Sequence, residues 1–400
     1  MSKMQTISRQ TTASTEAVTG EPFSLPPHWY YDAEIYRRES DAVFQRSWRC
    51  AGHKSEFTNS GDFVTVNYCD ESLLVVRSLD GVIRGFFNVC QHRGHRLMAE
   101  RRGNIKRAII CPYHAWSYGL DGAFKNAPNQ RNVPGFDKTR FCLPEVRIEE
   151  CGGFIWANAD PDAPALRDQA PGFDEALRRF LPDIDEAAFF EGWTESLPVN
   201  WKVQVDNGLD SYHFSTSGPA HRQLVASFKD LKRENHDHWL ISWGAAGDPN
   251  NGAYTFDPSD QRQDMDGFTL AWLYPDTLLV AMPMARVIMM YVMAPLGPEI
   301  SATDYAYYGP PGMRDSAVTR AAIDWMDKIL SAEDNSLFRG VQKGAKSRGF
   351  KGAYFMIDND HSHFSEHPIE RFHRLLNDEV TEANSPGAPR LKPDIDPALG

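Results

Sequence analysis

The stretch from Val89 to Gly122 constrains this chain more than any other, because it holds two short pairs of potential metal ligands. Each pair joins a Cys to a His across a tight turn, and residues 93–110 separate the two pairs. Two thiolates and two imidazoles can complete a four-coordinate metal site. The four residues are Cys90, His92, Cys111 and His114. They predict a metal centre held by two loops.

Two kinds of centre fit this ligand set. A structural zinc site binds a single ion with four ligands. A [2Fe–2S] Rieske cluster has two Cys on one iron and two His on the other. The segments CQHRGHRL and CPYHAWSYGLDG each supply one Cys and one His, as a Rieske cluster requires. We therefore favour a Rieske cluster and keep zinc as the alternative.

The composition is that of an ordinary globular chain. Its 400 residues suggest about two domains, and 42% hydrophobic and 24% charged residues are typical of a folded protein. A net charge of −12 argues against nucleic acid as a partner. The sequence shows no secretory signal and no apolar run of membrane-spanning length. The six Cys follow no disulfide spacing, so we expect a cytoplasmic protein with reduced thiols.

The hydrophobic pattern changes along the chain. A helix is expected over residues 31–48 with Asp32 as its N-cap, followed by short strands and turns, including an Asp80-Gly81 hairpin turn. Later segments read as a strand at 193–205, partial helix at 206–231, sheet at 268–296, and one long helix or two in succession at 314–344. The pattern indicates an α+β fold.

We expect a small antiparallel β domain with two ligand loops, and a larger domain of antiparallel sheet packed with helices. The expected divisions are a flexible tail at 1–26, an N-terminal helix at 27–44 packing on the catalytic domain, the cluster domain at 45–160, the catalytic domain at 161–380, and a disordered tail at 381–400.

A second group of residues points to another metal. Asp210 and His213 are spaced to share a helical face, and a carboxylate beside a metal-binding His fixes its tautomer. His221 follows the Gly218-Pro219 break, and Asp334 lies on the predicted C-terminal helix. Two His and one carboxylate form the facial triad of non-haem Fe(II) oxygenases, which leaves positions open for dioxygen.

These motifs together resemble the large (alpha) subunit of Rieske non-haem iron oxygenases, the aromatic ring-hydroxylating family. The segment NWKVQVDNGLDSYH resembles their mononuclear-iron segment, and HSHFSEHPIERFHRLL resembles their closing segment. The resemblance extends from about residue 25 to residue 376.

The resemblance implies roles for the residues named above. Cys90, His92, Cys111 and His114 would hold the [2Fe–2S] cluster, and His213, His221 and Asp334 would hold a mononuclear Fe(II). Asp210 would link His213 to His114 of an adjacent chain, which implies a homotrimer. Asn207 would be a further polar neighbour of the iron, with a helix cap as the alternative.

Two departures leave alternatives open. The family usually places the second His five residues after the first, where this chain has Gly218; an insertion in the loop would let His221 reach the same iron. Otherwise His221 is an ordinary loop imidazole, and the nearby substitutes His236 and His238 lie in a surface-like stretch. On a helix, Glu333 and Asp334 point about 100° apart, so only one faces the metal, and we favour Asp334.

The implied reaction is hydroxylation with dioxygen and electrons from NAD(P)H, delivered by a separate reductase because the sequence has no G-x-G-x-x-G fingerprint. The resemblance leaves open whether a ferredoxin and a small beta subunit take part. We expect an aromatic substrate, because Asp210 matches ring hydroxylases whereas relatives acting on quaternary ammonium compounds tend to have Glu there. Met and aromatic residues would suit a flat apolar ligand: Trp272, Tyr274, Met282, Met284 and Met289.

Two other functions remain in view. The stretch SRGF…SEH resembles the branch that oxidises methylated amines, so a monooxygenase acting on a methylated amine, quaternary ammonium compound or ether is the alternative. A Rieske electron-transfer protein without oxygenase activity would need only the first group of ligands.

Overall fold

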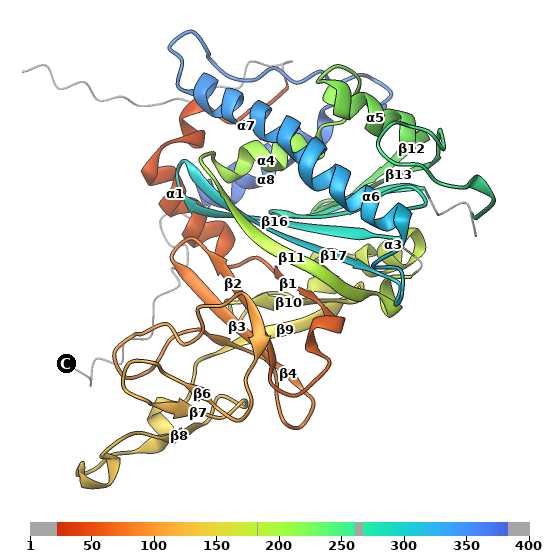
Figure 1. Cartoon of the computed structure of the whole chain (residues 1–400). Coiled ribbons are helices and arrows are strands. Elements are labelled where there is room, and N and C mark those ends of the chain that lie inside the picture. Colours follow the sequence, from red (N-terminus) through yellow and green to blue (C-terminus); the bar gives the residue numbers. More distant parts are fainter. Residues whose placement is uncertain (1–21, 182, 261–266, 383–400) are drawn as a thin grey trace, which may run out of the picture.

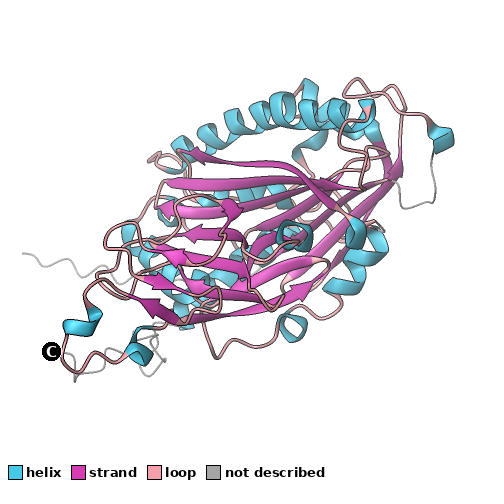
Figure 2. Cartoon of the chain, turned by 60° about the horizontal axis from the view of Figure 1, so that its bottom comes forward, coloured by secondary structure: helices cyan, strands magenta, loops and turns pink. Residues whose placement is uncertain are grey.

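A computed structural model of the chain describes residues 22–181, 183–260 and 267–382. In this part of the chain, two seven-stranded antiparallel sheets and a small three-stranded sheet pack with helices (Figures 1 and 2). The expected α+β class is therefore confirmed. Most of the two tails predicted from the sequence, at 1–21 and 383–400, lies outside the described residues.

The first sheet has the strand order β1-β10-β9-β4-β3-β2-β5. The predicted hairpin turn joins β3 to β4, where Gly81 has φ +84 and its N–H donates to the carbonyl of Ser78 at 3.0 Å. The three-stranded sheet β6-β7-β8 holds the second ligand loop. The strands are β1 (Arg49–His53), β2 (Asp62–Tyr68), β3 (Glu71–Arg77), β4 (Ile83–Phe87), β5 (Arg102–Asn104), β6 (Ile109–Ile110), β7 (Ser117–Tyr118), β8 (Phe124–Asn126), β9 (Glu145–Cys151) and β10 (Phe154–Asn158).

The second sheet has the order β11-β17-β16-β15-β14-β13-β12. Alternate residues of a strand point to opposite faces, so Met290 of β16 packs toward the first sheet while Tyr291 and Met293 face the helices. The strands are β11 (Ala188–Leu197), β12 (Phe228–Asn235), β13 (Trp239–Ala246), β14 (Phe268–Leu273), β15 (Thr277–Ala281), β16 (Ile288–Gly297) and β17 (Ile300–Gly309).

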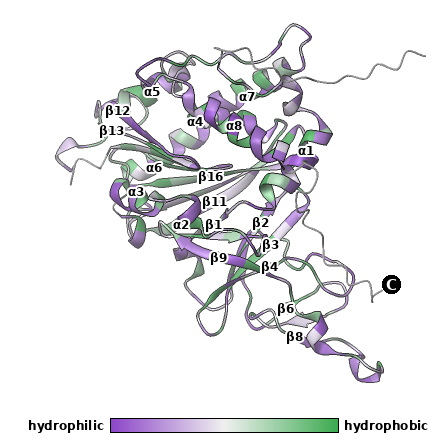
Figure 3. Cartoon of the chain, turned by 180° about the vertical axis from the view of Figure 1, so that it is seen from behind, coloured by the Kyte–Doolittle hydropathy of each residue, from purple (hydrophilic) through white to green (hydrophobic). Residues whose placement is uncertain are grey.

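Helices α4, α5, α7 and α8 gather on the face of the second sheet that points away from the first (Figures 1 and 3). Of the two possibilities predicted for 314–344, one long helix or two in succession, the structure shows two, α6 and α7, joined by a π-helical turn at Met326–Leu330. The helices are α1 (Ala33–Glu39), α2 (Leu166–Gln169), α3 (Phe173–Phe180), α4 (Trp201–Leu209), α5 (Pro219–Ser227), α6 (Ala317–Trp325), α7 (Ser331–Ala345) and α8 (His367–Glu382).

Three expectations need correction. The strand predicted at 193–205 ends at Leu197, and α4 follows because the Asn200 side chain caps it by accepting from the Lys202 N–H at 3.0 Å. The flexible tail predicted at 1–26 is packed at its end, since Leu25 is buried and its N–H donates to His373 of α8 at 3.0 Å. The disordered tail predicted from 381 begins later, because α8 continues to Glu382.

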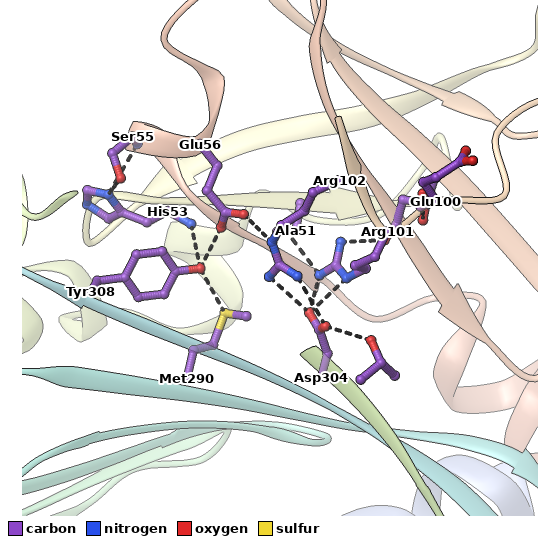
Figure 4. A network of polar contacts seen from close by, with 12 residues as sticks. Ala51, His53, Ser55, Glu56, Glu100, Arg101, Arg102, Met290, Asp304 and Tyr308 are labelled. Carbon is purple, nitrogen blue, oxygen red and sulfur yellow. Dashed lines mark hydrogen bonds and ion pairs between the residues drawn. The ribbon is translucent and has the colours of Figure 1, made fainter. Parts of the chain in front are cut away.

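A polar network joins the two large sheets (Figure 4). Arg101 and Arg102, at the edge of the first sheet, both reach Asp304 of β17. Glu56 pairs with Arg102 and accepts the hydroxyl of Tyr308, also on β17, at 2.5 Å. The charges are largely withdrawn from water, so they compensate one another rather than interacting with solvent. The network fixes the cluster-bearing part of the chain on the second sheet.

The segment before the first sheet packs on the helical side. The Glu39 carboxylate pairs with the buried Lys202 of α4 and accepts the indole N–H of Trp201 at 2.9 Å. The Tyr30 hydroxyl donates to Asp206 of the same helix at 2.6 Å. These contacts anchor α4, the helix that comes just before His213 in the chain. No helix among the described residues is long and apolar enough to cross a membrane.

Candidate metal centres

The two cluster loops share one backbone geometry. In the first loop the Cys90 N–H donates to the His95 carbonyl at 2.8 Å; in the second the Cys111 N–H donates to the Trp116 carbonyl at 2.8 Å. The fourth residue after each Cys has a left-handed backbone, with φ +69 at Gly94 and φ +56 at Ala115. Both loops therefore turn back tightly after the Cys. This turn lets a Cys and a His that are close in the sequence serve the same site.

The loops bring the four predicted ligands to one place. Cys90 and Cys111 are each 2% exposed, and burial is the main reason that the pKa of the Cys90 thiol is raised. The His92 and His114 rings lie 4.7 Å apart between centroids, and His92 stacks on Trp116 at an interplanar angle of 7°. The thiols thus lie inside and the imidazoles lie at the more open end of the site.

This arrangement fits a two-iron cluster better than one zinc ion. Four ligands of a single zinc lie about 4 Å or less from one another, given bonds of about 2.0–2.3 Å. Among the described residues, His213, His221 and Asp334 form the one group of three or more ligands whose atoms all lie within 4.8 Å of one another. The cluster-loop residues do not form so compact a group, as expected when Cys and His bind different irons.

His213, His221 and Asp334 converge although they come from three separate segments. The Nε2 atoms of His213 and His221 lie 3.1 Å apart, and Asp334 Oδ1 lies 3.2 Å from His221 Nε2. His213 lies in a 3₁₀ turn after α4, His221 in the first turn of α5, and Asp334 in the first turn of α7. Ligand atoms at right angles around a first-row metal, with bonds of about 2.1 Å, lie about 3 Å apart.

The tautomers of the His213 and His221 rings also indicate a metal between these residues and Asp334. Asp210 accepts from His213 Nδ1 at 2.8 Å, and Glu333 accepts from His221 Nδ1 at 2.5 Å. A proton on each Nδ1 leaves each Nε2 as a bare lone pair. Two lone pairs and a carboxylate oxygen at about 3 Å repel one another unless a cation lies between them. The donor set of this structure therefore fits a divalent metal such as iron.

Asp210 contacts His213 as the sequence predicted, but not on one helical face. Helix α4 ends at Leu209, and Asp210 has an extended backbone, with φ −92 and ψ 117. Its carboxylate accepts from the Tyr212 N–H at 2.5 Å and from the His213 N–H at 3.3 Å. The contact is therefore made by a turn that the Asp210 side chain itself organises.

Asn207 lies beside the triad. Its amide nitrogen is 3.3 Å from His213 Nε2 and 3.3 Å from Asp334 Oδ1. Asn207 lies inside α4, so the alternative prediction that it caps a helix is wrong. It is placed to donate to a ligand atom or to a group bound at the metal.

Glu333 is the residue whose role the sequence did not reveal. The sequence indicates Glu333 only as a rival of Asp334 for the metal, whereas the structure places the two carboxylates on opposite nitrogens of His221. The ring is 1% exposed. The roles of the seven metal-site residues as ligands stay predictions that this geometry favours.

A cavity of about 740 Å³, counting space open to solvent, adjoins the triad. Of the residues that the sequence suggested for a pocket, Met282 lines it, whereas Trp272, Tyr274, Met284 and Met289 are buried in the core instead. The wall is mostly apolar and aromatic: Gln204, Asn207, Gly208, Phe214, Leu224, Phe268, Leu270, Leu278, Val280, Met282, Tyr291, Met293, Tyr305, Met326, Leu330, Ser331, Asp334, Asn335 and Phe338.

Comparison with known proteins identifies the class. Residues 47–137 match the Rieske [2Fe–2S] domain, and residues 184–382 match the catalytic domain of the ring-hydroxylating alpha subunit. The chain is 35% identical over 360 residues to the carnitine monooxygenase oxygenase subunit of Escherichia coli K12, covering 89% of this chain and 93% of that protein.

Solved structures agree. A quaternary ammonium Rieske monooxygenase studied for carnitine oxidation by gut microbiota matches with a TM-score of 0.80 and 30% identity, covering 88% of this chain and 94% of that one. A naphthalene 1,2-dioxygenase variant bound to phenanthrene matches with a TM-score of 0.76 over 92% of this chain and 94% of that one, but at 18% identity it shows a shared fold alone.

The chain belongs to the Rieske non-haem iron oxygenase family, as an oxygenase alpha subunit. It is therefore an oxidoreductase whose cofactors are a [2Fe–2S] Rieske cluster and a mononuclear iron. This excludes both the zinc alternative for the cluster loops and the electron-transfer protein without oxygenase activity.

Proposed function

We propose that this oxygenase hydroxylates a carbon next to the nitrogen of a quaternary ammonium compound related to carnitine. The observation that carries the proposal is the 35% identity to a carnitine monooxygenase oxygenase subunit along 89% of the chain. This identity favours a quaternary ammonium substrate over the aromatic substrate that the sequence predicts.

The wall of the cavity supports a cationic ligand. A quaternary ammonium group donates no hydrogen bond and binds to the faces of aromatic rings. Tyr291 and Tyr305 contribute two such rings, 5.2 Å apart between centroids at an angle of 70°. The described lining residues include the Asp334 carboxylate but no Lys, Arg or His. Apart from the metal itself, the described wall would thus place no cationic side chain against the ligand, and the faces of the aromatic rings would bind it.

The reaction balances as a hydroxylation followed by cleavage. The substrate R₃N⁺–CH₂R′ with dioxygen, two electrons and two protons gives R₃N⁺–CH(OH)R′ and water. The hydroxylated carbon then loses its bond to nitrogen, releasing the amine R₃N, the aldehyde R′CHO and a proton. Iron held by His213, His221 and Asp334 would supply the reductive activation of dioxygen. Asp210 and Glu333 would keep the Nδ1 protons of the two His in place.

Electrons would come from NAD(P)H through a separate reductase, and from one chain to the next in a homotrimer. In Figure 1, strands β6–β8 lie at the opposite end of the molecule from α4, α5 and α7, which favours transfer between chains. The similar quaternary ammonium monooxygenase is described with inter-subunit electron transfer. Asp210 would link His213 to His114 of the neighbouring chain.

The surfaces around these two ends suit each other. Near the cluster, Ile110 and Tyr113 are exposed beside Arg93. Near Asp210, Tyr212 and Phe364 are exposed, with acidic groups such as Asp358 and Asp360 close in sequence. Apolar side chains with opposite charge around them are typical of a protein interface.

An aromatic substrate remains the second candidate, since Asp210 matches the ring hydroxylases and most of the cavity wall is apolar. The test is a product screen with a surrogate reductase and NADH. Carnitine, γ-butyrobetaine and glycine betaine are compared with benzoate and naphthalene. We expect NADH-dependent release of trimethylamine or another amine with its aldehyde. Hydroxylated naphthalene or benzoate without amine release would contradict the proposal.

A matched variant sharpens the screen. Replacing Tyr291 by Leu removes an aromatic face but keeps the wall apolar, so kcat/KM for the ammonium substrate should fall about 2–30-fold, equivalent to about 0.5–2 kcal/mol. Leu279→Met on β15, whose side chain packs on the other face of the sheet, is the control and should leave kcat/KM within about twofold. An equal loss in both variants would argue against ammonium binding at Tyr291.

A further inference from the structure

His221 lies between two carboxylates that belong to neighbouring residues of α7. Asp334 Oδ1 is 3.2 Å from Nε2, on the side of the triad, and Glu333 Oε1 is 2.5 Å from Nδ1, on the opposite side of the ring. The ring is buried, so these carboxylates, rather than water, decide which nitrogen keeps the proton.

Glu333 also holds the backbone that carries His221. Its two carboxylate oxygens accept the N–H groups of Ala220 and His221, each at 3.2 Å. These are among the first N–H groups of α5, which have no partner inside their own helix. The residue at the N-cap is Gly218, which has no side chain to cap the helix. Glu333 therefore caps α5 from another helix.

Gly218 and Glu333 form a matched pair. A Cβ atom at Gly218 would lie 2.3 Å from Oε2 and 2.5 Å from the carboxyl carbon of Glu333. Any side chain at 218 must therefore push the carboxylate away. Gly218 has φ 173, an extended backbone that any residue can adopt, so the glycine is needed for space and not for its backbone angle.

We infer that Glu333 is a positioning residue for the mononuclear iron, acting through His221. It fixes the Nδ1–H tautomer, holds the ring plane, and anchors the first turn of α5. This is how a His eight positions after His213 reaches the same point in space. The inference rests on the iron site of the proposed function, but not on its substrate.

A second reading treats Glu333 as a helix cap whose loss would only weaken folding. The two roles of Glu333 predict different effects on the affinity for the metal. A carboxylate that orients a metal-binding His typically changes metal affinity 10–100-fold when it is removed. Loss of a cap elsewhere in the same domain would change stability and leave metal affinity alone.

The test is the affinity of the full-length protein for Fe²⁺, measured with the Rieske cluster retained and the mononuclear iron removed. Fe²⁺ is titrated anaerobically against a ferrous chelator, and the denaturant unfolding curve followed by fluorescence reports whether the domain that holds the iron site stays folded. We expect Glu333→Gln to weaken Fe²⁺ binding about 10–100-fold.

Two further variants separate the position of the Glu333 carboxylate from its charge, and separate its effect on the iron from the general effect of losing a helix cap. Gly218→Ala keeps the charge of Glu333 but displaces its carboxylate, and should weaken Fe²⁺ binding in the same direction. Ser316→Ala removes the side-chain cap of α6, where Ser316 accepts from the Thr319 N–H, and should leave Fe²⁺ affinity unchanged.

Unchanged Fe²⁺ affinity in both Glu333→Gln and Gly218→Ala would overturn the inference. An equal loss in Ser316→Ala would also overturn it, because the effect would then follow from general destabilisation. A wild-type protein that binds no iron beyond the cluster would refute the iron site of the proposed function instead. A wild-type protein that binds iron but acts on another substrate would leave the inference standing.

Discussion

The two metal regions of this molecule are built on different principles. The cluster loops take all four predicted ligands from residues 90–114, on two turns with the same backbone pattern. The iron site takes its ligands from three segments, and residues 213 and 334 meet only because α4, α5 and α7 pack on one face of the second sheet.

Their surroundings differ as well. The cluster thiols are buried within a small core and the imidazoles lie at the open end. At the iron site, both imidazoles have a carboxylate on the nitrogen that points away from the triad. The difference teaches that a local motif can position a cluster, whereas a site assembled from distant segments needs additional groups to hold each ligand in place.

The largest expected effects are those that separate the two regions. Cys111→Ser should remove the cluster and its visible absorbance while the mononuclear iron remains. His213→Ala should remove the mononuclear iron and keep the absorbance, and both should abolish turnover. Iron and sulfide analysis should show about three irons and two sulfides per wild-type chain. Loss of both centres from one substitution would contradict their independence.

The next largest effect concerns the contact between the two sheets. Asp304→Ala leaves Arg101 and Arg102 without their shared carboxylate in a largely buried network, so the free energy of unfolding should fall by about 3–5 kcal/mol. Denaturant unfolding followed by fluorescence measures it. The control is Asp80→Ala, which breaks the exposed pair with Arg84 and should have a much smaller effect on stability. Equal effects would mean that the network does not hold the two parts together.

A smaller effect is expected at the predicted connection between the regions. Asp210→Asn keeps the size of the side chain but removes its charge beside His213. We expect reoxidation of the reduced cluster by dioxygen and substrate to slow about 10–100-fold in a single turnover, with Fe²⁺ supplied at saturation. Reoxidation at the wild-type rate would show that Asp210 serves neither His213 nor electron transfer.

The smallest effect is a pH dependence of protein stability, and it comes from a buried carboxyl on α8. Burial raises the pKa of Glu379 on α8 to about 7, and its carboxyl contacts the Tyr274 hydroxyl at 2.7 Å. The folded state thus keeps a proton that the unfolded chain releases near pH 4.5, so this contribution to stability is present below about pH 4.5 and is lost as the pH rises through about 7.

Thermal unfolding at several pH values between about 5 and 8 tests this expectation. The midpoint of the wild type should fall with rising pH more steeply than that of Glu379→Gln, whose amide does not titrate in this range. Parallel curves would show that Glu379 does not keep its proton in the folded protein.

The cluster loops could be predicted almost completely from the sequence, because each Cys and its neighbouring His lie within one short turn. The sequence also predicted that His213, His221 and Asp334 belong together, and the structure brings them within 4.8 Å. It did not reveal Glu333 as the partner of His221, because that contact joins positions 112 residues apart. The second half of the strand expected at 193–205 is helical because a side-chain cap and burial against the core override the strand preference of its Val residues.

What the sequence determined by itself was the chemistry of the metal centres and the α+β class, since ligand types and hydrophobic periods are local properties. The tertiary structure decided how the eight-residue spacing between the two His is accommodated. It also decided which carboxylate faces which side of His221, and which residues line the cavity. The physical reason is that each of these depends on the packing of α4, α5 and α7 against the second sheet, and such packing sets distances between residues that the sequence alone does not relate.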